Sequence, residues 1–116
     1  MYHKVADLLV VSPSTTLYTQ AVAMDGDDIL SLEAVLVTTT ASLGTNDLKL
    51  SMERCDALIN WQSLSANLVT FGGTVPAAKD GVITTSIPNN YVRVKIENAS
   101  GTATVVLSAS VNTKKS

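Results

Sequence analysis

The residues from Leu50 to Ser65, LSMERCDALINWQSLS, bring several reactive side chains into one short run. Cys55 is the only cysteine of the chain, and it stands between Arg54 and Asp56. A nucleophilic cysteine needs a base or a cation close to its sulfur to form the thiolate. The only histidine, His3, lies far away in sequence, in a segment that we expect to be a mobile N-terminal arm. We therefore expect Cys55 to be a small, inert thiol, and we assign no catalytic residue.

A second candidate for chemistry is the acidic stretch MDGDDILSLE, which carries Asp25, Asp27, Asp28 and Glu33. Carboxylate oxygens at short spacing are the ligands that Ca²⁺ prefers. The stretch does not fit the EF-hand loop, because no glycine stands at its sixth position and no glutamate at its twelfth. We interpret it as an acidic turn between strands, we assign no metal-binding or cofactor-binding residue, and we leave open whether the three aspartates bind a cation.

Trp61 suggests a third kind of site, an aromatic platform on which a sugar ring stacks. Such platforms need several coplanar aromatic rings, and this chain has one Trp, three Tyr and one Phe. A tryptophan at the start of a strand is more often an anchor in the core or at its edge. We favour the anchor for Trp61 and keep sugar binding as the alternative. The sequence has no glycine-rich phosphate loop and no paired-cysteine metal motif.

The composition limits the class of protein. The chain has 116 residues, of which 46% are hydrophobic and 16% charged, with a net charge of -2. This length suits one domain with a real core, and the hydrophobic content argues against disorder. Without a basic stripe, we expect no nucleic-acid partner. The N-terminal run MYHKVADLLVV is short and carries Asp7, so we expect no secretion signal and no membrane span, and synthesis in a reducing cytosol.

Alternation with a period of two, typical of β-strands, runs through most of the chain. It is clearest near the C-terminus, where Val92, Val94 and Ile96 share one face of the run YVRVKIE. In the following run TATVVLSASV, one face carries the alternate apolar residues Ala103, Val105, Leu107, Ala109 and Val111. The intervening NASG has the residues of a turn. We predict that the two runs pair as an antiparallel hairpin.

Earlier segments follow the same pattern. We predict strands over residues 5–12, 16–24, 29–40, 47–55, 59–71 and 82–87, with loops over 41–47 and 72–81. The run 47–55 and the run that follows it form a second hairpin, with Glu53 and Cys55 on one face of its first strand. About eight strands with turns between them predict an all-β fold, an antiparallel β-sandwich of the jelly-roll kind. We divide the chain into residues 1–15, an N-terminal arm or first strand, and residues 16–116, the sandwich domain.

Two stretches resemble proteins of known families. LKLSMERCDALINWQSLS is similar to a strand–turn–strand pattern common in viral and surface β-sandwiches, with Glu53, Asp56, Trp61 and Leu64 in comparable places and Cys55 where a small polar residue usually stands. NYVRVKIENASGTATVVLSASVN is similar to the terminal hairpin of small tailed-phage structural proteins. The chain thus resembles tailed-phage capsid decoration (cement) proteins of the β-sandwich or jelly-roll kind.

The resemblance covers roughly Ile29 to Asn112 and implies a structural virion protein without enzymatic activity. Members of this family bind the outside of an icosahedral head, often as homotrimers, and stabilise it by non-covalent contacts with the major capsid protein. It implies a place on the capsid surface after synthesis in the host cytoplasm, with no membrane and no cofactor. The segment Met1 to Ser14 is either an arm that pairs with another chain or a strand of its own domain. The alternatives are a carbohydrate- or receptor-binding β-sandwich of a phage tail or fibre, and a small enzyme or metal-dependent domain that uses the acidic turn.

Overall fold

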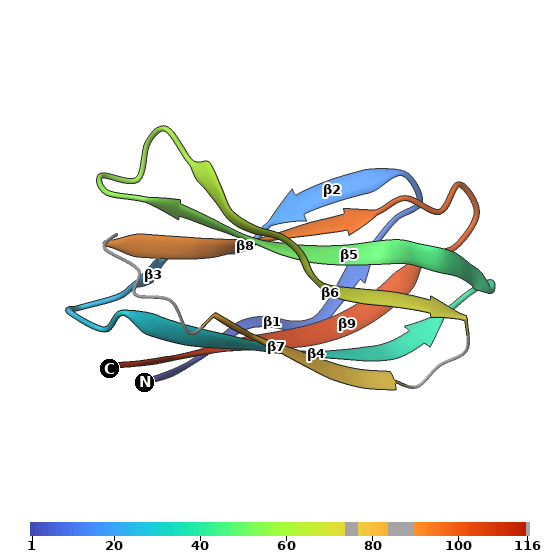
Figure 1. Cartoon of the computed structure of the whole chain (residues 1–116). Coiled ribbons are helices and arrows are strands. Elements are labelled where there is room, and N and C mark those ends of the chain that lie inside the picture. Colours follow the sequence, from blue (N-terminus) through green and yellow to red (C-terminus); the bar gives the residue numbers. More distant parts are fainter. Residues whose placement is uncertain (74–76, 84–89, 116) are drawn as a thin grey trace.

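The alternating segments form strands that pair into two antiparallel sheets stacked face to face (Figure 1). The computed structural model describes residues 1–73, 77–83 and 90–115. The strands are β1 Tyr2–Val11, β2 Thr15–Tyr18, β3 Val22–Ala23, β4 Ile29–Thr39, β5 Leu43–Cys55, β6 Gln62–Gly73, β7 Ala77–Ile83, β8 Tyr91–Asn98 and β9 Val105–Lys114. No helix occurs within these described ranges, and hence no helix that could span a membrane.

The first sheet has the order β1-β9-β4-β7 and the second has the order β2-β8-β5-β6, with β3 also paired to β8. Because β2 and β3 both lie against β8, they share one strand position, and the sandwich has eight positions. From β3 onward the chain changes sheet at every connection except β5–β6. Repeated crossing between two four-stranded sheets is the jelly-roll arrangement. The prediction of an antiparallel jelly-roll sandwich of about eight strands is confirmed.

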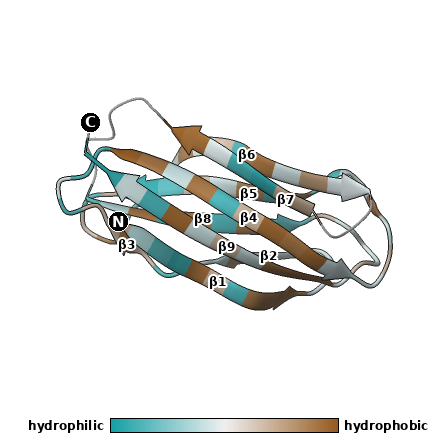
Figure 2. Ribbon diagram, turned by 90° about the horizontal axis from the view of Figure 1, so that it is seen from below, coloured by the Kyte–Doolittle hydropathy of each residue, from teal (hydrophilic) through white to brown (hydrophobic). Residues whose placement is uncertain are grey.

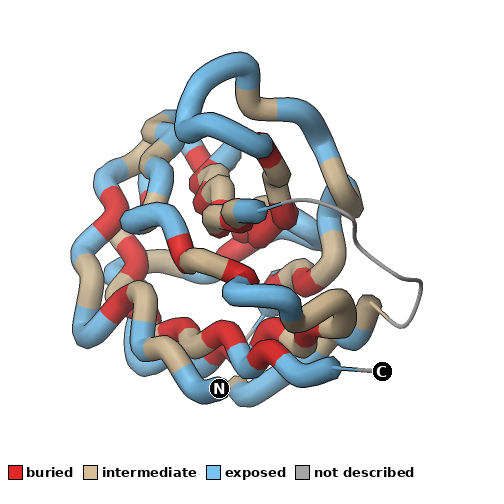
Figure 3. Tube along the Cα trace, turned by 90° about the vertical axis from the view of Figure 1, so that its left-hand side faces the viewer, coloured by how far each residue is buried: buried red, intermediate tan, exposed pale blue. Residues whose placement is uncertain are grey.

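The core lies between the two sheets and is lined by the residues that alternation assigned to it. Figure 3 colours the trace by burial and shows buried positions alternating with less buried ones along the strands. Alternation with a period of two gives each sheet one apolar face. The apolar faces of the two sheets pack against each other and form the core. The residues that alternation placed on the apolar faces of the two C-terminal runs are all buried: Val92, Val94, Ile96, Ala103, Val105, Leu107, Ala109 and Val111. The alternate residues of β4 and β5 are buried as well: Leu30, Leu32, Ala34, Leu36, Leu48, Leu50 and Met52.

The predicted hairpin between the last two strands is wrong. β8 pairs with β2, β3 and β5, whereas β9 pairs with β1 and β4 in the opposite sheet. The two strands do alternate as expected, but their connection crosses over the end of the core. The amide of Asn98 holds this crossing: its Nδ2 donates to the carbonyl of Ala103 at 2.8 Å and more weakly to those of Val11 and Ser12, and its Oδ1 accepts from the backbone of Ser100.

Several strand boundaries also differ from the predictions. The predicted strand 16–24 is split into β2 and β3, and β5 begins at Leu43, inside the predicted loop 41–47. The predicted loop 72–81 is partly wrong, because Ala77–Ile83 forms β7 and pairs with β4. Weak alternation in AAKDGVI hides this strand, since Ala, Lys, Asp and Gly all have low β propensity. The remainder of the predicted strand 82–87, residues 84–87, lies outside the described residues.

β1 is an edge strand of the first sheet and pairs with β9 from Tyr2 to Val11. His3 belongs to it and lies opposite Val111, so it is not in a mobile arm. The N-terminal ammonium donates to the carbonyl of Thr113. A register shift between Ala6 and Leu9 interrupts the pairing at Asp7 and Leu8, with Leu8 at φ 49°. This bulge turns the Leu8 side chain out of the core.

Candidate functional site

The stretch from Leu50 to Ser65 is the hairpin of β5 and β6, as predicted. Cys55 is buried, and its sulfur accepts a hydrogen bond from the backbone N–H of Leu58 at 3.2 Å. His3 lies on β1 in the other sheet. Since the base and the thiol belong to different sheets, the fold does not build the cysteine–histidine pair that thiol catalysis requires.

The acidic turn does not gather its carboxylates. Asp25 and Gly26 both have positive φ, and the N–H of Asp27 donates to the carbonyl of Met24, as in a type I′ turn. The Asp27 carboxylate accepts from the hydroxyl of Thr113 at 2.7 Å and lies 3.9 Å from the N-terminal ammonium. Glu33, the fourth candidate ligand, lies along β4. Among residues 1–73, 77–83 and 90–115 no three His, Cys, Asp or Glu side chains come close enough to hold a metal ion.

The outer face of the β2-β8-β5-β6 sheet carries a cluster of long side chains centred on Arg93. Its guanidinium lies 4.2 Å from the ring centre of Tyr18 and 4.2 Å from that of Trp61. Its Nε also pairs with Oε1 of Glu53 at 2.8 Å. We name these four residues the Arg93 cluster. Trp61 was predicted to be an anchor in the core or at its edge. The half-buried indole instead lies on the outer face against Arg93 and is not among the residues packed in or against the core.

The Arg93 cluster brings together residues from four places in the chain. Tyr18 ends β2, Glu53 lies on β5, Trp61 directly precedes β6 and Arg93 lies on β8. Glu53 and Arg93 are directly opposite in the β5–β8 register, so their pairing follows from the sheet. Charge–ring stacking and a charge-assisted hydrogen bond hold both rings in place. Tyr18 and Trp61 thus contact the same guanidinium, with the Tyr18 side chain exposed and the Trp61 side chain half-buried.

The outer face of the β1-β9-β4-β7 sheet is different, because its side chains are short and many are apolar. Exposed fractions reach 60% for Leu8, 56% for Val10, 41% for Val35 and 38% for Val37. Register places Val10 of β1 beside Val106 of β9, and Val35 of β4 beside Ala78 of β7. Between these two apolar pairs, Ser108 lies opposite Val35 and Thr38 lies opposite Val106. Figure 2 views this sheet from outside and shows brown segments along β1 and β4. We call the following six residues the apolar strip: Leu8, Val10, Val35, Val37, Ala78 and Val106.

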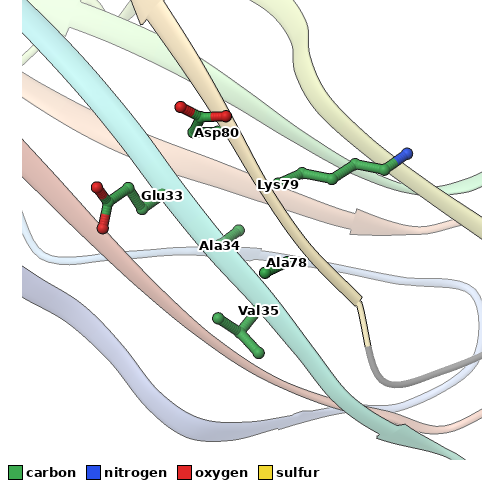
Figure 4. Close-up of a pocket in the computed structure, with 6 residues that line it drawn as sticks. All are labelled: Glu33, Ala34, Val35, Ala78, Lys79 and Asp80. Atoms are coloured by element: carbon green, nitrogen blue, oxygen red, sulfur yellow. The ribbon is translucent and has the colours of Figure 1, made fainter.

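Next to the apolar strip lies a shallow depression between β4 and β7 (Figure 4). Val35 and Ala78 line one end of it, and Glu33 and Asp80 the other. Glu33 and Asp80 are directly opposite in the β4–β7 register. Lys79 also lines the depression, but Figure 4 shows its side chain directed away from both carboxylates, and its Nζ donates to the carbonyl of Thr70.

Neither carboxylate of this pair has an ion pair or hydrogen bond within the part of the chain that the structure describes. The basic residue on the same row of the face, Lys4, lies at the far edge on β1 and pairs with Asp7 at 3.3 Å. Like charges directly opposite each other in a sheet are destabilising. The depression therefore presents uncompensated negative charge beside an apolar floor.

Comparisons with known proteins bear on the fold. The chain is similar to the VP2 subviral particle protein of infectious bursal disease virus, with a TM-score of 0.57 and 15% identity, over 96% of this chain and 31% of that one. It is also similar to the CBM22-1 xylan-binding domain of Paenibacillus barcinonensis Xyn10C, with a TM-score of 0.54 and 13% identity, over 87% of this chain and 73% of that one. No protein-family model and no curated protein matches the sequence.

The chain thus spans about a third of the viral protein's length, and at these identities both likenesses show the fold alone. They support a jelly-roll sandwich of the type found in a viral capsid protein and in a carbohydrate-binding domain. Sequence reasoning grouped Glu33 with the acidic turn and placed Asp80 in a loop, so it missed their pairing. The one available signal was alternation, which puts Glu33 on the outer side of its strand.

Proposed function

We propose that this chain is a structural virion protein that decorates the outside of an icosahedral capsid and stabilises it by non-covalent contacts with the major capsid protein. The observation that carries the proposal is the exposed apolar strip on the β1-β9-β4-β7 sheet. Large apolar side chains gathered on one exposed face often mark a site of contact with a partner. A flat sheet of short side chains suits broad contact with another protein surface. The jelly-roll likeness to a viral capsid protein supports the same function.

The proposal assigns no catalysis to the chain. Cys55 is buried on a different sheet from His3, and the Nζ of Lys79, which lines the depression between β4 and β7, donates to the carbonyl of Thr70. The chain acts through surfaces presented by a rigid scaffold. We propose that it assembles as a homotrimer at the capsid surface, as the resemblance to decoration proteins implies, so that each weak contact is reinforced by avidity.

Co-sedimentation with empty tailed-phage heads, stripped of auxiliary proteins, tests this function. We expect saturable binding at a fixed copy number per head, and a trimer by mass analysis in solution. Bound heads should withstand higher temperature than bare heads, because ligand binding to the assembled state shifts its stability. A protein that never pellets with heads over a wide concentration range would overturn the proposal.

The Arg93 cluster favours a second candidate function, the binding of a carbohydrate. Aromatic rings beside charged and polar groups are what a sugar-binding face needs, since apolar faces of a sugar stack on rings while hydroxyls bond to polar groups. The likeness to a xylan-binding domain supports this candidate. A glycan array that includes xylan, read with wild type and with Trp61→Ala, tests it. Binding that Trp61→Ala abolishes while the fold is retained would favour this function over capsid decoration.

A further inference from the structure

The two outer faces of the sandwich differ in whether their charged side chains find partners within the chain. On the β2-β8-β5-β6 sheet, charged side chains pair with one another, as in Glu53–Arg93 at 2.8 Å and Lys95–Glu97 at 3.5 Å. On the β1-β9-β4-β7 sheet, members of the apolar strip are exposed, and Glu33 and Asp80 lie opposite each other in register without a cationic partner among the described residues. The second face therefore keeps exposed apolar side chains and two carboxylates that have no cationic partner among the described residues.

The outer face of β1-β9-β4-β7 combines two negative charges with neighbouring apolar side chains. Its two carboxylates lie on the same side of the sheet as Val35 and Ala78, which form the floor at the other end of the depression. A lysine or arginine side chain has the matching shape: an apolar stem ending in a positive group. An arginine fork can also bond to two carboxylates at once. The depression is thus complementary to a long basic side chain whose stem lies on Val35 and Ala78 and whose head lies between Glu33 and Asp80.

We infer that the outer face of β1-β9-β4-β7 docks onto a protein surface that inserts a lysine or arginine side chain into the β4–β7 depression and covers the apolar strip with aliphatic groups. This inference rests on the proposed function, under which the partner surface is that of the capsid. Burial of the strip supplies the bulk of the affinity, and the charge contact sets the position of the partner. Repulsion between Glu33 and Asp80 in the free protein is relieved on docking.

The test compares single neutralisations on the two outer faces by co-sedimentation with empty phage heads. We expect Glu33→Gln and Asp80→Asn each to weaken binding by about fivefold, as for a charged contact at the border of an interface. Glu97→Gln, which removes one negative charge from the opposite face, is the matched control and should bind as the wild type does. Val35→Ser should also weaken binding, by removing apolar contact without changing charge. The melting temperatures of Glu33→Gln and Asp80→Asn should equal or exceed that of wild type.

The outcomes separate this inference from the proposed function. If wild type binds heads and the Glu33, Asp80 and Val35 variants bind as well as Glu97→Gln does, the inference is wrong while the proposed function stands. If wild type does not bind heads, the proposed function fails and this inference with it. Dimerisation of the purified protein that Val35→Ser abolishes would assign the face to a second copy and overturn the inference. Calcium-dependent stabilisation that Asp80→Asn removes would assign the carboxylates to a cation and would overturn it as well.

Discussion

Glu53 and Arg93 lie opposite each other on adjacent strands β5 and β8, with Oε1 and Nε 2.8 Å apart. Their side chains are only 16% and 22% exposed, and the rings of Tyr18 and Trp61 both stack on the guanidinium. A partly shielded ion pair is less screened by water than a surface pair. This pair therefore connects β8 to β5 and also fixes the guanidinium that both rings contact.

Replacing Glu53 with Gln should lower the free energy of unfolding by about 1 kcal/mol, because Arg93 keeps a neutral acceptor but loses its charge partner. Urea unfolding followed by the fluorescence of Trp61, the only tryptophan, measures this change. Glu97→Gln is the control, since Glu97 pairs with Lys95 at 3.5 Å in a more exposed position. Its cost should be below about 0.5 kcal/mol. Equal effects of the two substitutions would show that the aromatic cover does not strengthen the pair.

Replacing Asn98 with Ala should destabilise the fold by about 2–4 kcal/mol, because it leaves buried backbone groups at the β8–β9 crossing without their partner. Asn98 is 2% exposed, and its amide bonds to four backbone groups. Asn90→Ala serves as the control, since the Asn90 amide makes an exposed bond to the carbonyl of Asp56. Thermal and urea unfolding of both variants provide the comparison. A cost below about 1 kcal/mol for Asn98→Ala would contradict the role of this amide at the crossing.

Replacing Gly72 with Ala should cost about 1–3 kcal/mol, as for other substitutions that force atoms into a packed site. A Cβ at this position would lie 2.6 Å from the carbonyl oxygen of Gly44, so β5 and β6 would have to separate. Gly101→Ala is the control, because a Cβ there meets nothing within 4 Å. We expect its effect to be within about 0.5 kcal/mol. Similar melting temperatures for the two variants would show that the hairpin adjusts without cost.

Replacing Asp27 with Asn should lower the melting temperature, because the carboxylate bonds to the buried Thr113 hydroxyl and lies near the N-terminal ammonium. A bond to a charged acceptor contributes about 1.5–3 kcal/mol at most, and less here since the site is partly open to water. Asp25→Asn is the control, since Asp25 is exposed at a positive-φ turn position that Asn tolerates well. We expect calcium to leave both melting curves unchanged. A calcium-induced increase that Asp27→Asn removes would show instead that the turn is a cation site.

Sequence alternation was enough to predict the class of fold and most of the core. Leu32 and Val94 are buried because each lies on the apolar side of a strand with a period of two, and this property is local. It does not depend on which strand lies beside which. Alternation fails where a strand has few residues of high β propensity, as in Ala77–Ile83. Its pairing with β4 is evident only from the structure of the sheet.

Tertiary structure alone decided the partners of each strand. β8 and β9 are neighbours in sequence and both alternate, yet they belong to opposite sheets. A strand with one apolar face can be buried in either sheet, because both sheets cover the same core, so alternation does not determine its partners. That choice brings Arg93 against Tyr18 and Trp61, and it places Glu33 opposite Asp80. Contacts of this kind join residues tens of positions apart, so they follow from strand order and register. The sequence by itself determined which side of each strand faces the core, whereas the outer surfaces through which we propose that the protein acts were assembled by long-range pairing.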